Sequence, residues 1–142
     1  MVDTVSKSVR SEIMRRVRSE NTGPEVTLRR ALFAKGLRYR LHYNHLPGKP
    51  DIVFPSAKLA VQVRGCFWHG HGCSRTRVPK SNTEFWKNKI DRNKARDAQS
   101  DRQLRKLGWT VLCVWECSIV NAPGLEKQTK RVIGALEKRR VP

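Results

Sequence analysis

The sequence predicts one α/β domain built on a mixed β-sheet. Its apolar and polar residues fall into the order helix, three strands, helix, strand, helix, which is typical of a sheet covered by helices. A length of 142 residues suits a single hydrophobic core. We therefore expect a single domain over residues 1–142, in which residues 1–20 form a flexible arm.

The first two predicted helices differ in their signals. Ser11–Arg18 places Ile13, Met14 and Val17 on one face, with arginines around them. Thr22-Gly-Pro-Glu25 has the pattern of a capping box, in which the Thr hydroxyl and the Glu carboxylate satisfy each other's backbone donors. Such a cap would account for Glu25 fully. This second helix is expected to end near residue 35, before Gly36, and to bury Leu28, Ala31 and Leu32.

Three extended segments follow the second helix. Residues 38–43 alternate between polar and apolar side chains, which predicts a half-exposed strand with Tyr39, Leu41 and Tyr43 facing inward. Pro47-Gly48 predicts a turn. Residues 51–54 and 59–63 are mostly apolar and favour a hairpin near the middle of the sheet.

The remaining elements are a long helix, a strand and a last helix. Ser81-Asn-Thr-Glu84 is a second capping-box pattern, and the helix it opens should run to about Leu107, before Gly108. Trp109–Val114 predicts a buried strand and Leu125–Arg139 an amphipathic helix. The expected core contacts of the two helices are Phe85, Ile90, Leu104, Leu107, Val132, Ile133 and Leu136.

The net charge of +18 favours a polyanionic partner. Residues 1–50 carry 11 basic and 4 acidic side chains, and residues 75–110 repeat that balance. Between them, residues 51–63 contain only two charged residues, Asp51 and Lys58. This predicts nucleic-acid binding. Asp51 is then either a catalytic carboxylate between phosphate-binding arms or the end of a core strand. The helix at residues 11–18 either docks on the core or lies along DNA, with Met14 as an apolar probe.

Nothing in the sequence indicates a membrane protein. No apolar run approaches the roughly 20 residues of a membrane span, and the start Met-Val-Asp-Thr-Val lacks the apolar core of a signal peptide. We expect a cytoplasmic protein. Its four cysteines are then metal ligands or buried thiols rather than disulfides.

The stretch from Arg64 to Cys73 combines two cysteines, two histidines and an aromatic pair between glycines. Three thiols and one imidazole would form a Cys₃His site typical of structural zinc, with Cys66, His71, Cys73 and Cys117 as its ligands. His69 is an alternative to His71 as the imidazole ligand. Buried thiols without metal are the other interpretation, and Cys113 fits an ordinary core position.

The two hairpin strands also carry a possible catalytic pattern. Pro50-Asp51 begins one strand and Gln62-Val63-Arg64 ends the next, which has the form of the proline-Asp … (Asp/Glu)-x-Lys pattern of restriction-type nucleases. In that chemistry a carboxylate binds Mg²⁺, a second oxygen ligand completes the site, and a cation stabilises charge on the phosphate. Gln62 and Arg64 would fill the last two roles.

Five motifs of this sequence match a known family. They are Pro47-Gly48-x-Pro50-Asp51, Gly65-Cys-Phe-Trp-His69 with Cys73, Thr83-Glu-Phe-Trp86, Leu107-Gly-Trp109 and Val114-Trp-Glu-Cys117. With them the sequence resembles the very short patch repair endonucleases, which nick DNA beside T:G mismatches left by deamination of 5-methylcytosine. The resemblance covers roughly residues 6–120. It implies a restriction-endonuclease-like fold, structural zinc and Mg²⁺-dependent nicking.

The resemblance also implies a role for each matched residue. Asp51 would bind Mg²⁺ together with the backbone carbonyl of Val63, and His69 would activate the attacking water. Glu25 and Asp97 would support His69 and the waters around the metal. The zinc ligands would be Cys66, His71, Cys73 and Cys117. The side chains that wedge into the base stack would be Phe67, Trp68 and Trp86, with Met14 approaching from the minor groove.

The sequence departs from the family at Arg64, where the best-known members carry a second histidine. An arginine stabilises charge but does not shuttle a proton, and the amide oxygen of Gln62 is a further candidate metal ligand. Both residues make the site look more like that of a general restriction-type nuclease.

Three hypotheses therefore stay open. The first is a T:G-specific nicking endonuclease, the second a sequence-specific nickase or restriction-like nuclease that cuts matched duplex, and the third a zinc-stapled DNA-binding module without activity. We expect catalytic Mg²⁺ and structural Zn²⁺ as cofactors and double-stranded DNA as the partner. Other mismatch-repair proteins are further candidate partners, and a monomer suits the cutting of one strand.

Overall fold

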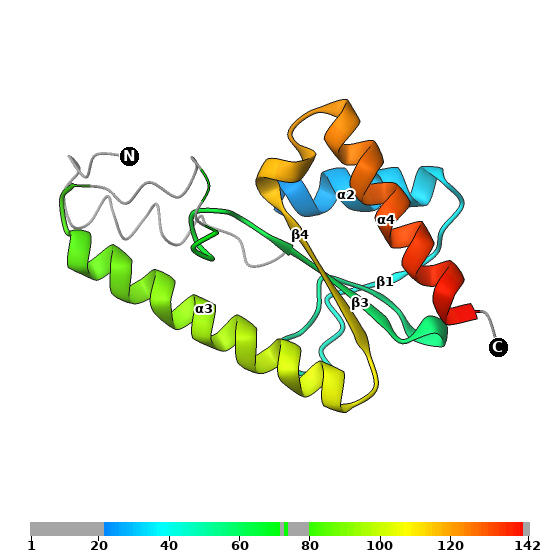
Figure 1. Cartoon of the computed structure of the whole chain (residues 1–142), viewed down its shortest axis with the longest axis horizontal. Helices are drawn as coiled ribbons and strands as arrows, with labels where there is room; N and C mark the ends of the chain where they lie inside the picture. The colour runs from blue at the N-terminus through cyan, green and yellow to red at the C-terminus, as the bar shows by residue number, and fades with distance from the viewer. Residues whose placement is uncertain (1–21, 72, 74–79, 141–142) are drawn as a thin grey trace.

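The protein is organised around a mixed four-stranded sheet (Figure 1). The structure is a computed structural model that describes residues 22–71, 73 and 80–140. Of residues 139 and 140 it describes the backbone only. The predicted helix at residues 11–18 and the arm at residues 1–20, with Met14, lie outside the described residues. The elements are helix α2 (Gly23–Ala34), strands β1 (Arg40–Leu41), β2 (Ile52–Phe54) and β3 (Leu59–Arg64), helix α3 (Thr83–Lys106), strand β4 (Thr110–Trp115) and helix α4 (Ala122–Arg140). Their order confirms the predicted order.

The sheet has the strand order β1-β2-β3-β4. β1, β2 and β3 are antiparallel neighbours, and β4 pairs with β3 in parallel after the crossover through α3. Figure 1 shows α2 and α4 on one face of the sheet and α3 on the other. The predicted hairpin and mixed sheet are thus confirmed. None of the described helices is both long and apolar enough to cross a membrane.

Strand β3 is buried along its whole length and divides the core in two. Val61 and Val63 pack with the α2 and α4 side chains, whereas Ala60 packs with Leu104 of α3. Because side chains alternate along a strand, the polar Gln62 and Arg64 share the face of Ala60. The strand therefore carries polar side chains beneath α3, at its carboxyl end.

The first predicted capping box does not form, and the long helix begins one residue later than the second box predicts. Thr22 is the N-cap of α2 but makes no side-chain capping hydrogen bond. Helix α3 begins after Asn82, whose φ of 55° is left-handed, and the hydroxyl of Thr83 donates to the carbonyl of Lys80 at 2.9 Å. The interpretation of Glu25 as a cap is therefore wrong, because its carboxylate is buried and contacts Arg29, one turn along the helix, and His42, from the segment after β1.

The first strand is shorter than predicted. It ends at Leu41 because His42 takes a positive φ of 46°. Leu41, expected to face inward, is 37% exposed. The bend instead brings His42 to the N-terminal turn of α2, where it contacts Glu25.

Two predicted core residues of the long helix lie at its ends and are exposed. Phe85 occupies the first turn of α3 and is 48% exposed. Leu107 follows the last helical residue, so it leaves the helix face that buries Leu104, and it is 54% exposed. Leu104, Ile90, Val132 and Leu136 are buried as predicted.

Candidate active site

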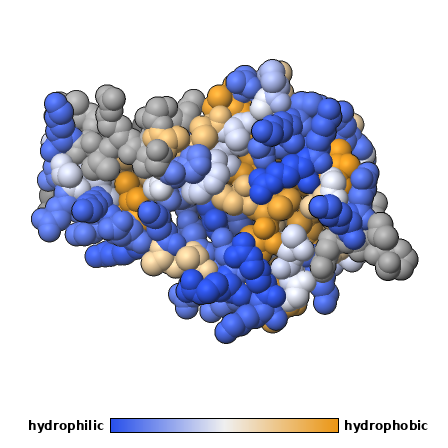
Figure 2. Space-filling model, viewed as in Figure 1, coloured by the Kyte–Doolittle hydropathy of each residue, from blue (hydrophilic) through white to orange (hydrophobic). Residues whose placement is uncertain are grey.

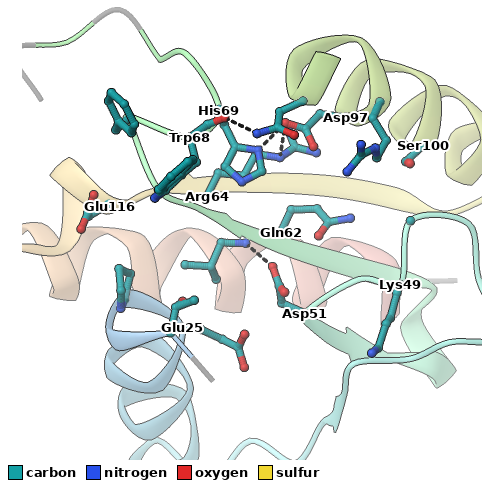
Figure 3. A pocket seen from close by; sticks show the side chains of 18 of the residues that line it. Glu25, Lys49, Asp51, Gln62, Arg64, Trp68, His69, Asp97, Ser100 and Glu116 are labelled. Carbon is teal, nitrogen blue, oxygen red and sulfur yellow. Dashed lines mark hydrogen bonds and ion pairs between the residues drawn. The ribbon is translucent and has the colours of Figure 1, made fainter. Parts of the chain in front are cut away.

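A pocket of about 910 Å³ opens where β3 ends beside the start of α2 (Figure 3). Its walls come from α2, from the turn before β2, from the end of β3 with the loop that follows, and from one face of α3. Elements far apart in the sequence thus converge on it. The pocket brings together the seven residues predicted for catalysis or magnesium binding, namely Glu25, Asp51, Gln62, Val63, Arg64, His69 and Asp97.

Asp51 is fixed to the sheet by a backbone hydrogen bond. The amide of Val63 donates to its Oδ2 at 2.8 Å. The β2–β3 ladder pairs Ile52 with Val61, so Val63 lies beyond the paired part of β2, where the carboxylate takes the place of a strand partner. Burial raises the pKa of Asp51 to about 6, and the nearby Glu25 adds to this, although the Val63 hydrogen bond opposes it. A cation beside Asp51 would therefore be strongly favoured.

Glu25 is a buried carboxylate with two hydrogen-bond donors. Its side chain is 1% exposed, and its Oε2 lies 3.0 Å from Nη1 of Arg29 and 2.7 Å from Nε2 of His42. Buried carboxylates need such partners. Glu25, His42 and Asp51 each offer a ligand atom, and these atoms lie within 4.8 Å of one another. The three side chains can share one cation.

No local sequence pattern singles out His42, which the alternation of residues 38–43 places on the outer face of a strand. Its position follows from pairing, because Leu41 lies opposite Ile52 and the amide of His42 donates to the carbonyl of Asp51 at 3.0 Å. Aligning the predicted strands in antiparallel register would have placed His42 beside Asp51.

A second group of charged residues joins the end of β3 to α3. Nδ1 of His69 lies 2.6 Å from Oδ2 of Asp97. Arg64 donates to both carboxylate oxygens of Asp101, at 3.1 and 2.9 Å, and its Nε lies 3.6 Å from Oδ2 of Asp97. Asp97 and Asp101 are one helical turn apart and so share a face of α3. That spacing was the only sequence signal for Asp101, which the motifs missed.

The guanidinium of Arg64 is buried and paired. Desolvation alone would lower its pKa, but the hydrogen bonds that Arg64 donates to Asp101 and the charge of Asp97 more than offset this and raise it. Its cation therefore faces α3 and two carboxylates. Contact between Arg64 and a phosphate stays a prediction.

Three thiols and an imidazole meet next to the pocket. The ligand atoms of Cys66, His71, Cys73 and Cys117 lie within 4.8 Å of one another, which confirms the predicted grouping. His71, not His69, is the imidazole of this cluster, and its ring stacks on Trp115 at 4.1 Å. Burial raises the pKa of the Cys66 thiol to about 12. This donor set can hold a metal ion, which would deprotonate the thiols.

Three aromatic rings stand at the pocket rim and behind it. Phe67 and Trp68 line the pocket, and their ring centroids lie 5.7 and 5.8 Å from that of Trp86. Asn93 of α3 donates to the carbonyl of Trp68 at 2.7 Å and holds the loop. Trp86 differs from the prediction that it wedges into DNA. It is 2% exposed, so in this conformation it supports the other two rings.

Basic side chains surround these groups. Lys49, Lys89 and Arg96 line the pocket, and Figure 2 shows hydrophilic side chains along α3 on the viewed face. A cation site, a histidine held by a carboxylate and a basic lining together suit hydrolysis of a phosphodiester in a polyanion. The exposed basic residues of α3 are Lys87, Arg92, Lys94, Arg96, Arg102, Arg105 and Lys106.

Comparison with known sequences agrees with this chemistry. The sequence profile described as DNA mismatch endonuclease Vsr matches residues 2–75. The chain is 44% identical to the Type II nicking enzyme V.XorIIP of Xanthomonas oryzae pv. oryzae, over 94% of this chain and 98% of that protein. It is 41% identical to the Type II nicking enzyme V.NmeAIP of Neisseria meningitidis, over 94% and 95%. It is 39% identical to the DNA mismatch endonuclease Vsr of Escherichia coli, over 94% and 83%.

Replacing Asp51 by Asn is expected to stabilise the protein when the pocket holds no cation. The pKa of Asp51 rises from 3.8 to about 6 on folding, so the folded state binds more protons than the unfolded state in that window. Stability therefore falls as the pH rises through it. At about 1.4 kcal/mol per pKa unit, the variant should be more stable by roughly 1–3 kcal/mol at about pH 8.

Urea unfolding in magnesium-free buffer without chelator measures this difference. The gap between variant and wild type should widen mainly between about pH 4 and about pH 6, and then level off above about pH 7. Asp91→Asn, an exposed change on α3 that removes the same charge, is the matched control and should not reproduce the stabilisation at about pH 8. A destabilised Asp51→Asn variant at about pH 8 would contradict the burial argument.

Proposed function

The chain belongs to the DNA mismatch endonuclease Vsr family, and we propose that it nicks one strand of duplex DNA beside a T:G mismatch. Membership in this family, expected from the sequence motifs, makes the protein a DNA endonuclease. The observation that carries the proposal is a single pocket that combines the Asp51 cation site, the His69–Asp97 pair and basic walls. We further propose that residues 1–142 act as one domain and as a monomer.

The residues around Asp51 fit a magnesium ion. The carboxylates of Asp51 and Glu25 are the oxygen ligands that Mg²⁺ prefers, and their burial without a cation is unfavourable. A residue's N–H and C=O point to the same side of a strand, so the carbonyl of Val63 would face the same position. Gln62 offers an amide oxygen nearby. When bound, Mg²⁺ neutralises charge on the scissile phosphate and lowers the pKa of a water.

His69 is the proposed general base. Asp97 lies 2.6 Å from its Nδ1, and a proton on Nδ1 leaves Nε2 as the atom that accepts a proton. The water proton goes to Nε2, the water oxygen bonds to phosphorus, and the bridging oxygen of the cut strand leaves. Lys49, Lys89 and Arg96 would hold the flanking phosphates.

His42 is a proposed supporting residue of the same site. Its Nε2 lies 2.7 Å from Glu25, which is buried and faces Asp51 across the cation site. Together with Arg29 it fixes the orientation of that carboxylate.

Phe67 and Trp68 are the proposed wedge. They stand at the rim of the pocket on the buried Trp86. Inserting an aromatic side chain costs a few kcal/mol of base stacking per step, and a mismatched base is the least costly to displace. A rigid aromatic support therefore favours cutting beside a mismatch.

A second candidate function is nicking of matched duplex. Arg64, where the best-known members have histidine, is committed to the carboxylates of Asp97 and Asp101. Two relatives are also named Type II nicking enzymes. A DNA-binding module without activity fits the family less well and leaves the His69–Asp97 pair without a purpose.

Purified protein with Mg²⁺ should nick one strand of a duplex that carries T:G in its recognition site. The same duplex with a T:A pair should be cut at least about tenfold more slowly, because unstacking a matched base costs more. Labelled strands separated on a denaturing gel give both nicking rates. A plasmid library that carries the T:G pair between random flanking sequences supplies candidate recognition sites.

Two variants and two outcomes complete this assay. Asp51→Ala should abolish nicking while DNA binding is retained, and Asp91→Asn should nick like the wild type. Equal cutting of both duplexes would support the second candidate function instead. Full activity of Asp51→Ala would overturn the proposed metal site.

The protein should contain about one zinc ion per chain, since Cys₃His sites prefer tetrahedral zinc. Elemental analysis of dialysed protein measures this. Cys117→Ser should lower the zinc content and the unfolding temperature, whereas Cys113→Ser, outside the cluster, should keep the zinc. A folded wild-type protein without zinc would rule out a structural zinc ion.

A further inference from the structure

Asp101 contacts the pocket residue Arg64. Of the four residues in this charged group, Arg64, Asp97 and His69 are among the described residues that line the pocket. Asp101 stands behind them on α3, with a side chain that is 13% exposed. Figure 3 shows the dashed contacts that link Arg64, Asp97 and His69.

His69 and Arg64 both approach the same oxygen of Asp97. Its Oδ2 lies 2.6 Å from Nδ1 of His69, which is hydrogen-bond distance, and 3.6 Å from Nε of Arg64, which is not. The terminal nitrogens of Arg64 instead bind Asp101 through two parallel hydrogen bonds. Paired contacts of this kind are the strongest that an arginine forms with a carboxylate.

We propose that Asp101 is a positioning residue that holds Arg64 away from Asp97, so that Asp97 stays available to orient His69. The inference rests on the proposed role of His69 as the base. Without the Asp101 carboxylate, the guanidinium of Arg64 is a buried cation that lacks its main partner, which is strongly unfavourable. Asp97 is already 3.6 Å away. Arg64 then moves onto Oδ2, and His69 loses the group that orients it.

The central test is a double-mutant cycle of Asp101→Asn and Arg64→Met in the nicking assay. Asp101→Asn alone should lower kcat on the order of 10–100-fold, as the loss of outer supporting residues does in other sites, with little change in KM. In the Arg64→Met background the same substitution should have no further effect, because no guanidinium remains to compete for Asp97. Asp91→Asn, with the same charge change on the same helix, should leave kcat unchanged.

Two results of the cycle would overturn the proposal. One is a wild-type kcat for Asp101→Asn. The other is an equal loss in both backgrounds, which would mean that Asp101 acts independently of Arg64. Circular dichroism and urea unfolding identify concentrations and temperatures at which every variant is folded, so that lost stability is not counted as lost kcat.

The tautomer of His69 gives a readout that does not depend on nicking. Nitrogen-15 NMR of the imidazoles, with the His69 signal identified by its absence in His69→Gln, should show the proton on Nδ1 in the wild type and in Asp91→Asn. Asp101→Asn should shift that signal toward a mixture of tautomers. An unchanged signal would overturn the proposal. A shifted signal in a protein that cuts no tested duplex would uphold it while refuting the proposed function.

Discussion

The hydrogen bond from the amide of Val63 to Asp51 is the contact on which the site depends. It holds a carboxylate at the end of a buried hairpin, where Glu25 and His42 arrive from α2 and from the bend after β1. Desolvation and the second carboxylate make that place unfavourable for negative charge, and they raise the pKa of Asp51 to about 6. The fold thus keeps an electrostatically unfavourable site that a bound cation would stabilise. Active sites are commonly destabilising to the folded protein in this way.

The loop after β3 contributes residues both to the cysteine–histidine cluster and to the pocket. Cys66 and His71 join the cluster with Cys117, and the amide of His71 donates to the carbonyl of Cys66 at 3.0 Å. Between them, His69 is left to face Asp97 on α3. A metal ion in the cysteine–histidine cluster would therefore fix the backbone on both sides of His69. Small shifts of that backbone would change the position of the His69 imidazole relative to a bound phosphate.

The sequence predicted what local patterns determine. Hydrophobic periodicity placed the hairpin and the long helix, and an unusual density of thiols and imidazoles placed the cysteine–histidine cluster. The failures have a common cause, because they depend on tertiary partners. A Thr–Glu spacing suggested a cap, but the Glu25 carboxylate is buried against His42, a partner from the segment after β1 that no local pattern shows. The role of Asp101 depends on the packing of β3 against α3, which places Arg64 beside it, and no local pattern predicts that packing.

The central claim is that the catalytic cation binds at Asp51, and Mn²⁺ tests it directly. Mn²⁺ takes the same oxygen ligands as Mg²⁺ and gives an anomalous signal in X-ray diffraction. Crystals of the protein soaked in Mn²⁺ should show a peak about 2–2.3 Å from the carboxylate of Asp51 and near the carbonyl of Val63. The peak should vanish in Asp51→Asn. Mn²⁺ bound elsewhere in the pocket, or bound equally in that variant, would contradict the account.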